Sequence, residues 1–255
     1  MHDFSSRAAF VTGGSRGVGR AIALEFAARG ANVAVVYKAR RDSAEAVAAE
    51  IESGGRKALA LQADVGDSAA VAAAFARARD AFGGIDIVAH SAGAQVEWKA
   101  VRDQDPAAWA AFVRSDLIGA FNVVHAAVGH MHARGRGVII AISSIAAQMC
   151  QPRNSQGAAA KAGVEALIRV VAREEGRYGI RANVISIGLT DTDQAREAFA
   201  SWGEAATRKV IDGIPLKRIG KPQEIARMAA YLASEDGSYV TGKVIQVDGG
   251  QMIAG

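Results

Sequence analysis

A glycine-rich stretch near the start of the chain has the residue types needed to hold a phosphate group. Residues 12–19 read Thr-Gly-Gly-Ser-Arg-Gly-Val-Gly, between the apolar run 8–11 and the alanine-rich segment 20–29. A buried strand, a glycine turn and a helix N-terminus point backbone N–H groups and the positive end of the helix dipole outward. Glycine also lets the backbone approach a ligand closely. We expect a dinucleotide pyrophosphate to be bound here, with a plain tight turn as the alternative; the binding residues are Gly13, Ser15, Arg16, Gly17, Val18 and Gly19.

The end of the second apolar run indicates which dinucleotide is bound. The run 32–36 ends in Tyr37, where a site selective for NAD usually has an acid that binds the ribose 2′-hydroxyl. Cations stand nearby instead, namely Arg16 in the glycine turn, Lys38, Arg40 and Arg41. Because cations without a carboxylate suit a 2′-phosphate, we expect NADP(H) as the cofactor. The alternative is that these residues are solvated surface charges.

Two further run ends carry residues that suit a cofactor site. The third run ends at Asp64 and Val65, where the carboxylate can accept from an adenine amino group or, alternatively, cap the next helix. The fourth ends in His-Ser-Ala-Gly, and its small residues Ala92 and Gly93 would let the chain pass beneath the cofactor. His90 is a candidate catalytic base, but we expect a buried, hydrogen-bonded histidine.

These motifs follow short β-branched runs that alternate with longer alanine-rich amphipathic segments. Strands are predicted near residues 8–12, 32–37, 58–63, 85–90, 137–143, 181–186 and 243–247. Helices are predicted near residues 17–29, 43–53, 68–82, 106–133, 155–178 and 222–233. Continuous apolar strands such as 138–142 indicate burial on both faces, so the pattern predicts an α/β fold with a doubly wound parallel sheet of about seven strands. Ligands bind such sheets beyond the carboxyl ends of the strands, where every motif above falls.

Composition narrows the class of protein. The 255 residues are 50% hydrophobic with 28 Gly and 4 Pro, which suits one domain over residues 1–255 with a large core. The net charge is +4, but the positive charges are scattered, so no nucleic-acid partner is expected. A single cysteine excludes an intrachain disulfide and fits a reducing cytoplasm. Residues 1–7 have no apolar signal core and no apolar run approaches the ~18 residues of a membrane span, so we expect a cytoplasmic protein without membrane association.

Several motifs together resemble the short-chain dehydrogenase/reductase family, in particular its bacterial 3-oxoacyl-carrier-protein reductase type. The resemblance covers nearly the whole chain and rests on the glycine turn, Asp64-Val65, Ala92-Gly93, Ser144 with Lys161, and segments 218–226, 239–242 and 247–250. It implies a Rossmann fold, NAD(P) binding, a proton-transfer group of Asn, Ser, Tyr and Lys, and usually a homotetramer. By the same resemblance, Lys161, Gly188 and Thr192 contact the cofactor.

The chain departs from the family pattern where chemistry is expected. Ser144 and Lys161 are kept, but Gly157 stands thirteen residues after the serine, where the pattern has its tyrosine. Asp116 stands at the position of the asparagine. An engineered Tyr-to-Gly substitution would explain position 157 alone. Natural divergence explains better why other family positions also differ, namely His90, Ser91, Asp116 and Ile187.

The missing phenol limits the chemistry that remains. Hydride transfer to a carbonyl makes an alkoxide, which must receive a proton; in the family a tyrosine beside the lysine supplies it. Positions 157 and 161 are one helical turn apart and would face one cleft, so Gly157 leaves a ring-sized space for water or a bulkier substrate. Loss of a general acid typically costs about 10²–10⁴-fold in rate. We expect Ser144 to bind the substrate oxygen, Lys161 the nicotinamide ribose, and Asp116 to orient water or Lys161.

Other reactive side chains have simpler interpretations. Three histidines share the predicted helix 106–133, but 130 and 132 do not share a face, so no metal site is expected; the histidines are His125, His130 and His132. Cys150 is expected to be an inert thiol.

The segment 189–213 is predicted to be a mobile loop that forms a substrate lid and contains Asp191 and Asp193. The tryptophans Trp98, Trp109 and Trp202 are expected to be packing residues, with Trp202, in the lid, best placed to contact substrate.

The sequence leaves three functions open. The first, which we favour, is an NADP(H)-binding oxidoreductase that acts on a small-molecule carbonyl or alcohol, with substrate or water supplying the proton. The second is a catalytically silent subunit or cofactor-binding partner of an active homologue. The third is a non-redox enzyme on this scaffold, such as an isomerase, dehydratase or cyclase. The expected assembly is a homotetramer or a hetero-oligomer with a homologue.

Overall fold

Seven parallel strands form one continuous sheet in the order β3-β2-β1-β4-β5-β6-β7. The strands are β1 (Ala8–Thr12), β2 (Asn32–Tyr37), β3 (Ala58–Gln62), β4 (Ile87–His90), β5 (Gly137–Ser144), β6 (Ile180–Ile187) and β7 (Val244–Val247). This computed structural model describes residues 3–253, so Met1 and His2 of the polar N-terminal stretch lie outside it. The predicted doubly wound parallel sheet is confirmed.

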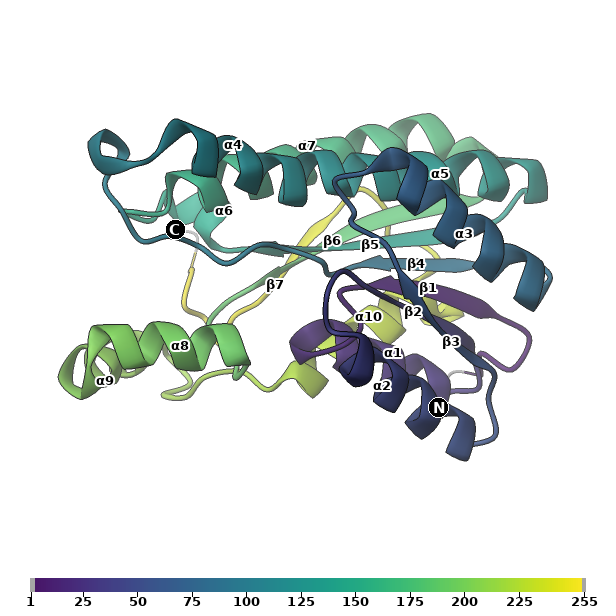
Figure 1. Cartoon of the computed structure of the whole chain (residues 1–255), viewed down its shortest axis with the longest axis horizontal. Coiled ribbons are helices and arrows are strands. Elements are labelled where there is room, and N and C mark those ends of the chain that lie inside the picture. Colours follow the sequence, from purple (N-terminus) through teal and green to yellow (C-terminus); the bar gives the residue numbers. More distant parts are fainter. Residues whose placement is uncertain (1–2, 254–255) are drawn as a thin grey trace.

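Helices cover both faces of the sheet, as Figure 1 shows. Below it in this view lie α1 (Gly17–Ala28), α2 (Arg41–Ser53) and α10 (Pro222–Ala233). Above it lie α3 (Ser68–Phe82), α4 (Pro106–Val113), α5 (Gly119–Arg134) and α7 (Ser155–Glu175). The short α6 (Ala146–Met149), together with α8 (Asp193–Trp202) and α9 (Glu204–Gly213), lies near the carboxyl edge of the sheet.

Two apolar cores lie on the two faces of the sheet because side chains alternate along each strand. In β1, Ala9 and Val11 join the core with α1, α2 and α10, whereas Ala8 and Phe10 join the core with α3, α5 and α7. Both cores need apolar side chains on successive strand residues. This explains the continuous apolar runs in the sequence.

The strand order reverses next to β1, and this reversal positions the site. The chain winds from β1 to β2 and β3 on one side, then returns to β4 on the other side of β1. The connections that leave the carboxyl ends of β1 and β4 therefore diverge and leave a crevice between them. The glycine turn after β1 and residues 91–94 after β4 border this crevice.

Two predicted segments differ from the structure. The predicted helix 106–133 is divided by a π-helical turn, Arg114–Ile118, between α4 and α5. The segment 189–213, predicted as a loop, contains the helices α8 and α9, which meet at Gly203. Phe199 and Trp202 are three residues apart and share one face of α8, so this segment carries a helical apolar pattern that the loop interpretation missed.

One described segment, Pro106–Arg134, is long and apolar enough by mean hydropathy to cross a membrane. The sequence expectation rested on uninterrupted apolar runs and did not detect it. In the fold, 44% of its most apolar stretch is buried, and its α5 part packs on α3 and α7. Core helices pass the same test, so this is weak evidence for a membrane span.

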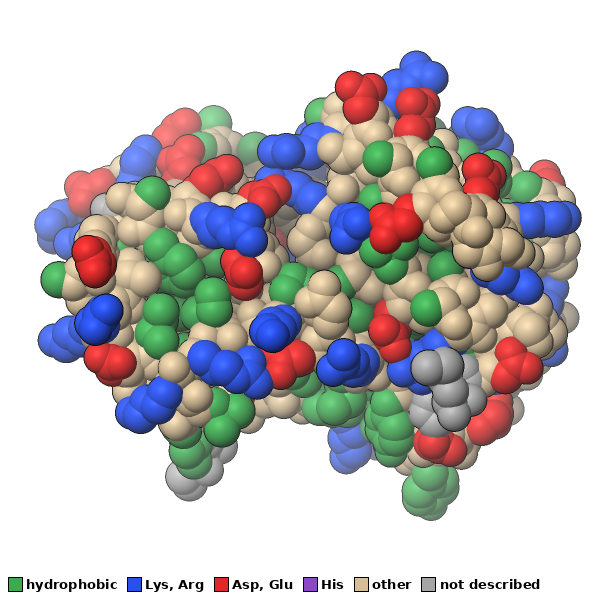
Figure 2. All heavy atoms as spheres, turned by 90° about the horizontal axis from the view of Figure 1, so that it is seen from below, with side chains coloured by type: hydrophobic (Ala, Val, Ile, Leu, Met, Phe, Trp, Pro, Cys, Tyr) green, Lys and Arg blue, Asp and Glu red, His purple; other side chains and the backbone are tan. Residues whose placement is uncertain are grey.

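The face seen in Figure 2 has acidic and basic side chains interspersed, without a broad area of one sign.

Candidate active site

The glycine turn connects β1 to α1 through backbone that leaves no room for a side chain at Gly13 and Gly19. Gly13 has a φ of +66°, and a Cβ atom there would lie 2.8 Å from the Ser91 carbonyl oxygen. A Cβ atom on Gly19 would collide with the Gly13 carbonyl oxygen. Arg16 takes the N-cap position of α1 without a side-chain cap hydrogen bond. The first N–H groups of α1 are therefore available to an anion, as the sequence predicts.

A single cleft of about 1020 Å³ runs from this turn along the carboxyl edge of the sheet. Except for Arg41 and the alternative base His90, the residues predicted for the cofactor or for chemistry line it, which brings together segments from the first to the sixth strand. The predicted lining residues are Gly13, Ser15, Arg16, Gly17, Val18, Gly19, Lys38, Asp64, Val65, Ala92, Gly93, Asp116, Ser144, Gly157, Lys161, Gly188 and Thr192. The sequence thus located the cleft correctly; the role of each residue stays a prediction.

Lys38 and Asp64 form an ion pair at the expected adenosine end of the cleft. Lys38 Nζ lies 2.7 Å from Asp64 Oδ2, and this hydrogen bond is the main reason why the pKa of Asp64 lies below its usual value. Asp64 is not the cap of α3, because Asp67 accepts hydrogen bonds from the first N–H groups of that helix. The proposed contact of Asp64 with adenine would therefore have to coexist with Lys38.

The other predicted cations divide into two groups. Arg40 and Arg16 line the cleft; Arg16 lies 3.7 Å from Asp193, and Arg40 has no ion-pair partner among the described residues. Arg41 instead pairs with Glu45 at 2.8 Å along α2 and does not line the cleft. It was grouped with the others on sequence proximity alone, and the start of α2 turns it away.

Asp116 and Lys161 form a buried ion pair at the other end of the cleft. Lys161 Nζ lies 2.9 Å from Asp116 Oδ1, and their side chains are 16% and 1% exposed. Asp116 Oδ2 accepts from Ala94 N–H at 2.7 Å, and Lys161 also donates to the Ile142 carbonyl oxygen. The π-helical turn carries Asp116 into this position. This geometry is the one expected for a carboxylate that orients the lysine.

Ser144 ends β5, and its hydroxyl has a free hydrogen. Its Oγ accepts from Ala146 N–H at 3.2 Å, and within the described chain no acceptor takes the hydroxyl proton. Gly157 lies in the first turn of α7, where Asn154 is the N-cap and accepts from Gly157 N–H at 3.2 Å. A Cβ atom on Gly157 would collide with Asn154 Oδ1 and lie 2.9 Å from its Cγ.

The side-chain amide of Asn154 therefore occupies the beginning of the ring-sized space that the sequence predicts beside Ser144. Asn154 is 4% exposed and its side chain lies where a side chain of residue 157 would begin. Sequence reasoning missed Asn154. The available signal was an asparagine directly before a predicted helix, which is a preferred N-cap.

The histidines have separate environments. His90 is 1% exposed, its Nδ1 lies 3.0 Å from Thr12 Oγ1, and burial lowers its pKa to about 3. It is thus a neutral, hydrogen-bonded core histidine, as expected. His130 Nε2 accepts from Ile85 N–H, His132 pairs with Glu175, and His125 stacks on Phe121. Cys150 is exposed after α6.

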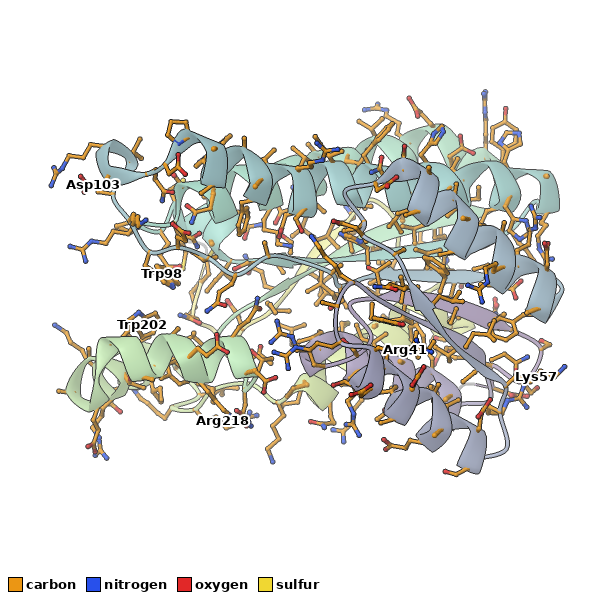
Figure 3. The ribbon with its side chains drawn as sticks, in the orientation of Figure 1. Arg41, Lys57, Trp98, Asp103, Trp202 and Arg218 are labelled. Carbon is orange, nitrogen blue, oxygen red and sulfur yellow. The ribbon has the colours of Figure 1, made fainter. Side chains whose placement is uncertain are left out.

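An aromatic pair lies at the wide end of the cleft. In Figure 3, Trp98 and Trp202 face each other across the opening from the two sides. Their ring centroids are 5.6 Å apart in an edge-to-face arrangement, and both residues line the cleft. Gln95 Nε2 also donates to Glu197 Oε2 at 2.7 Å, which joins the β4 loop to α8. Trp109 does not line the cleft and donates to Ser155 Oγ instead.

The chain is similar to known oxidoreductases along its whole length. A family model described as Enoyl-(Acyl carrier protein) reductase matches residues 13–252. The 3-oxoacyl-(acyl-carrier-protein) reductase of Staphylococcus epidermidis is 34% identical over 245 residues, which are 96% of this chain and 98% of the relative. The 3beta-hydroxysteroid dehydrogenase 1 of Eggerthella lenta is 37% identical over 253 residues, which are 98% and 95% of the two chains.

The fold comparison agrees with the sequence comparisons. A short-chain type dehydrogenase/reductase from Mycobacterium ulcerans has a solved structure that matches with a TM-score of 0.93 at 30% identity, over 98% of this chain and 91% of that chain. The chain therefore belongs to the short-chain dehydrogenase/reductase family, whose members are oxidoreductases that use a nicotinamide cofactor and act on small molecules.

Proposed function

We propose that this protein is an NADP(H)-dependent oxidoreductase that interconverts a neutral ketone and its alcohol without a phenolic acid. The observation that carries the proposal is the single cleft that joins the open N-terminus of α1 to Ser144 and the Asp116–Lys161 pair. A dinucleotide needs both ends of such a cleft, one for the pyrophosphate and one for the reacting ring.

The preference for NADP(H) is supported by the charges around the expected 2′-position. Arg40 has no ion-pair partner within the described residues, and Lys38 is 69% exposed next to Asp64. A 2′-phosphate carries more negative charge than Asp64 and can compete for both cations. No acid follows Tyr37 directly to bind a free 2′-hydroxyl.

A bound nicotinamide supplies or accepts the hydride. Ser144 Oγ–H donates to the substrate oxygen, and Lys161, held by Asp116, donates to the ribose hydroxyls. No tyrosine lines the cleft beside Ser144 among the described residues, so water takes over the proton transfer. We infer a slow enzyme, since loss of a general acid costs about 10²–10⁴-fold.

The substrate end of the cleft favours a neutral, apolar ligand. The apolar side chains that line the cleft besides the tryptophan pair include Val96, Phe112, Ile145, Leu189, Ala198 and Val210. Lys161 is the cation at this end, and Asp116 neutralises it. A carboxylate or phosphate substrate would therefore meet no uncompensated positive charge there. The relative named for a 3beta-hydroxysteroid suggests a ring-bearing alcohol or ketone.

Binding and turnover test the proposal in sequence. NADPH and NADH are titrated by fluorescence, and NADPH oxidation is then followed with cyclic ketones, a 3-ketosteroid and 3-oxoacyl thioesters. NADPH binding with slow reduction of a cyclic ketone is expected. Folded protein that binds neither nucleotide would contradict the proposal. Product formation from a substrate without net change in the nucleotide would instead indicate a non-redox enzyme.

Selectivity is tested with Lys38→Ala. We predict that it weakens NADPH binding by about tenfold and NADH binding by less than threefold, because the lost contact is to the 2′-phosphate. Arg41→Ala is the matched control, since Arg41 does not line the cleft and should leave both affinities unchanged. Equal weakening of both nucleotides by Lys38→Ala would reject the 2′-phosphate role.

A catalytically silent partner subunit is the second candidate. It is favoured by one observation: Asn154 fills the space through which a side chain of residue 157 would enter the cleft. Purification as a stable complex with a tyrosine-bearing homologue, together with no turnover by the isolated chain, would support it. A homo-oligomer that turns over a ketone would exclude it.

A further inference from the structure

The amide of Asn154 is buried at the cleft with one of its two polar ends unused. Its Oδ1 accepts from Gly157 N–H at 3.2 Å and caps α7, and this bond fixes which end of the amide is oxygen. Its Nδ2 has no acceptor anywhere in residues 3–253. The residue is 4% exposed and lines the cleft together with Ser144 and Lys161.

A helix cap alone does not require an amide. Serine, threonine or aspartate cap equally well through one oxygen, and none of them leaves two N–H bonds without an acceptor. Asn154 Nδ2 is not one of the fully buried side-chain atoms that lack a hydrogen-bond partner, so it keeps contact with the cleft, where water or a ligand can reach it. The unused Nδ2 is therefore available to an acceptor that enters the cleft.

Ser144 presents a second unused donor to the same cleft. Its Oγ already accepts from Ala146 N–H, and its hydroxyl hydrogen is free to turn toward an acceptor in the cleft. Lys161 is less available for this role, because Asp116 and the Ile142 carbonyl oxygen take two of its three N–H bonds and the third is assigned to the ribose hydroxyls. Two neutral donors at a site for hydride transfer suit an oxygen on which negative charge develops.

We propose that Asn154 Nδ2 and Ser144 Oγ form an oxyanion hole for the carbonyl oxygen of the substrate, so that Asn154 is a catalytic residue. The proposal rests on the reductase function proposed above. The carbonyl carbon accepts a hydride with its electron pair from the reduced nicotinamide, which becomes oxidised. The carbonyl π electrons move to the oxygen, and the alkoxide is held by both donors. The alkoxide then takes a proton from water, and the hydroxide left is neutralised by solvent.

The amide stabilises charge in this scheme but transfers no proton. It keeps both of its hydrogens throughout, unlike a phenol. The rate of reduction should therefore show no ionisation of residue 154 in its pH profile. Gly157 has a related role, since any side chain at 157 would collide with Asn154 Oδ1 and displace the amide.

Asn154→Asp separates the donor from the cap. The carboxylate keeps an oxygen for Gly157 N–H but has no N–H to donate, so α7 stays capped while the hole loses one donor. We expect kcat for the cyclic ketone that the wild type reduces fastest to fall about 10²-fold, with the Kd for NADPH and the thermal midpoint nearly unchanged. A kcat within threefold of wild type would overturn the proposal.

Asn154→Ser controls for the negative charge of the aspartate. Serine is neutral and keeps a cap oxygen, but its side chain is too short to reach the same position. It should lose a similar factor in kcat; full activity in this variant would show that the aspartate acts through its charge, which would also overturn the proposal. Asp67→Ala removes the cap of α3 outside the cleft and should lower stability without changing kcat.

A binding measurement keeps this inference separate from the proposed function. If the wild type turns over no ketone, the proposed reductase function fails. Calorimetry then measures the affinity of the NADP⁺-loaded protein for a 3-ketosteroid, which still depends on the hydrogen bonds from the two donors to the ketone oxygen. Asn154→Asp should weaken this binding about tenfold, and equal affinities in the two proteins would overturn the oxyanion hole.

The double variant Asn154→Ala with Gly157→Tyr is the complementary test. Gly157→Tyr alone should lose activity, because its Cβ atom meets the Asn154 amide. Removal of that amide makes room for the ring, so the double variant should recover activity above Asn154→Ala and acquire a pH dependence from the phenol. Equal activity of Gly157→Tyr and the wild type would show that Asn154 does not occupy this space.

Discussion

Two side chains of opposite charge lie next to each other at one end of the cleft. Asp116 and Lys161 lie 2.9 Å apart, and Asp116 is almost fully buried. Replacing one member of a buried pair leaves the other charge without compensation, which destabilises the fold. The pair also makes this end of the cleft neutral. We therefore expect Asp116 to influence both stability and which ligands are accepted.

We predict that Asp116→Asn lowers the free energy of unfolding by about 1–3 kcal/mol, because Lys161 loses its counter-charge but keeps a polar neighbour. The variant should also bind carboxylate-bearing ketones more tightly than the wild type. Urea unfolding and competition with NADPH oxidation measure the two effects. Asp191→Asn, which removes an exposed partner of Arg196, should cost less than about 1 kcal/mol. Equal costs for the two variants would contradict the role of burial.

His90 predicts how stability depends on pH. Burial lowers its pKa from 6.5 to about 3, so between these values the unfolded chain binds a proton that the native chain does not. Stability due to this group is complete above pH 6.5 and is lost as the pH falls, by at most about 1.4 kcal/mol per pH unit. His90→Asn should flatten the dependence between pH 6.5 and 4.5 in urea unfolding, whereas exposed His125→Asn should not. A wild-type slope unchanged in His90→Asn would refute this assignment.

At the scale of elements, the strands and the helices that cover the sheet were predictable, because a local pattern of apolar residues is enough to identify each of them. A buried parallel strand needs consecutive apolar residues, and a covering helix needs one apolar face. The segment 189–213, which the sequence predicts to be a lid, was predicted less well. Its helices α8 and α9 line the cleft through only part of their surface, so their sequence is more polar and was interpreted as a loop.

The lid makes a prediction about substrate affinity. Trp202 on α8 lines the cleft, and its ring centroid lies 5.6 Å from that of Trp98 and 5.7 Å from that of Phe199. Trp202→Ala should raise KM for a cyclic ketone about tenfold, since an aromatic contact and its apolar burial are lost. NADPH affinity should stay the same. Trp109→Phe, which changes a tryptophan outside the cleft, is the control, and an unchanged KM in Trp202→Ala would argue against a lid that contacts substrate.

At the scale of the whole molecule, the sequence located the cleft but not its internal pairings. Parallel topology brings the carboxyl ends of the strands together, so motifs at those ends had to converge. Lys38 pairs with Asp64 although the two side chains come from separate loops. Asn154 overlaps the space beside Gly157 because of the local geometry at the start of α7. No rule of sequence spacing predicts such contacts, so only the three-dimensional structure shows them.

Assembly is the remaining property at this scale. Large apolar side chains are half exposed on neighbouring elements of the upper layer in Figure 1, namely Ile118 at 46%, Phe121 at 52% and Val170 at 50%. Exposed apolar side chains on packed helices are typical of subunit contacts, which supports the predicted homotetramer or hetero-oligomer. We propose that such a contact shields Phe121 from water, so that a charge at that position would be buried without a partner.

Phe121→Asp should therefore dissociate the oligomer at micromolar concentration, as measured by analytical ultracentrifugation, while the monomer retains its fold. Val101→Asp is the matched control: Val101 is 76% exposed on a turn before α4, and its substitution should leave the assembly intact. An oligomer unaffected by Phe121→Asp would place the subunit contact elsewhere. Because the cleft opens at the carboxyl edge of the sheet, away from α5, NADPH should still bind the dissociated chain, and loss of that binding would mean that assembly supports the cleft.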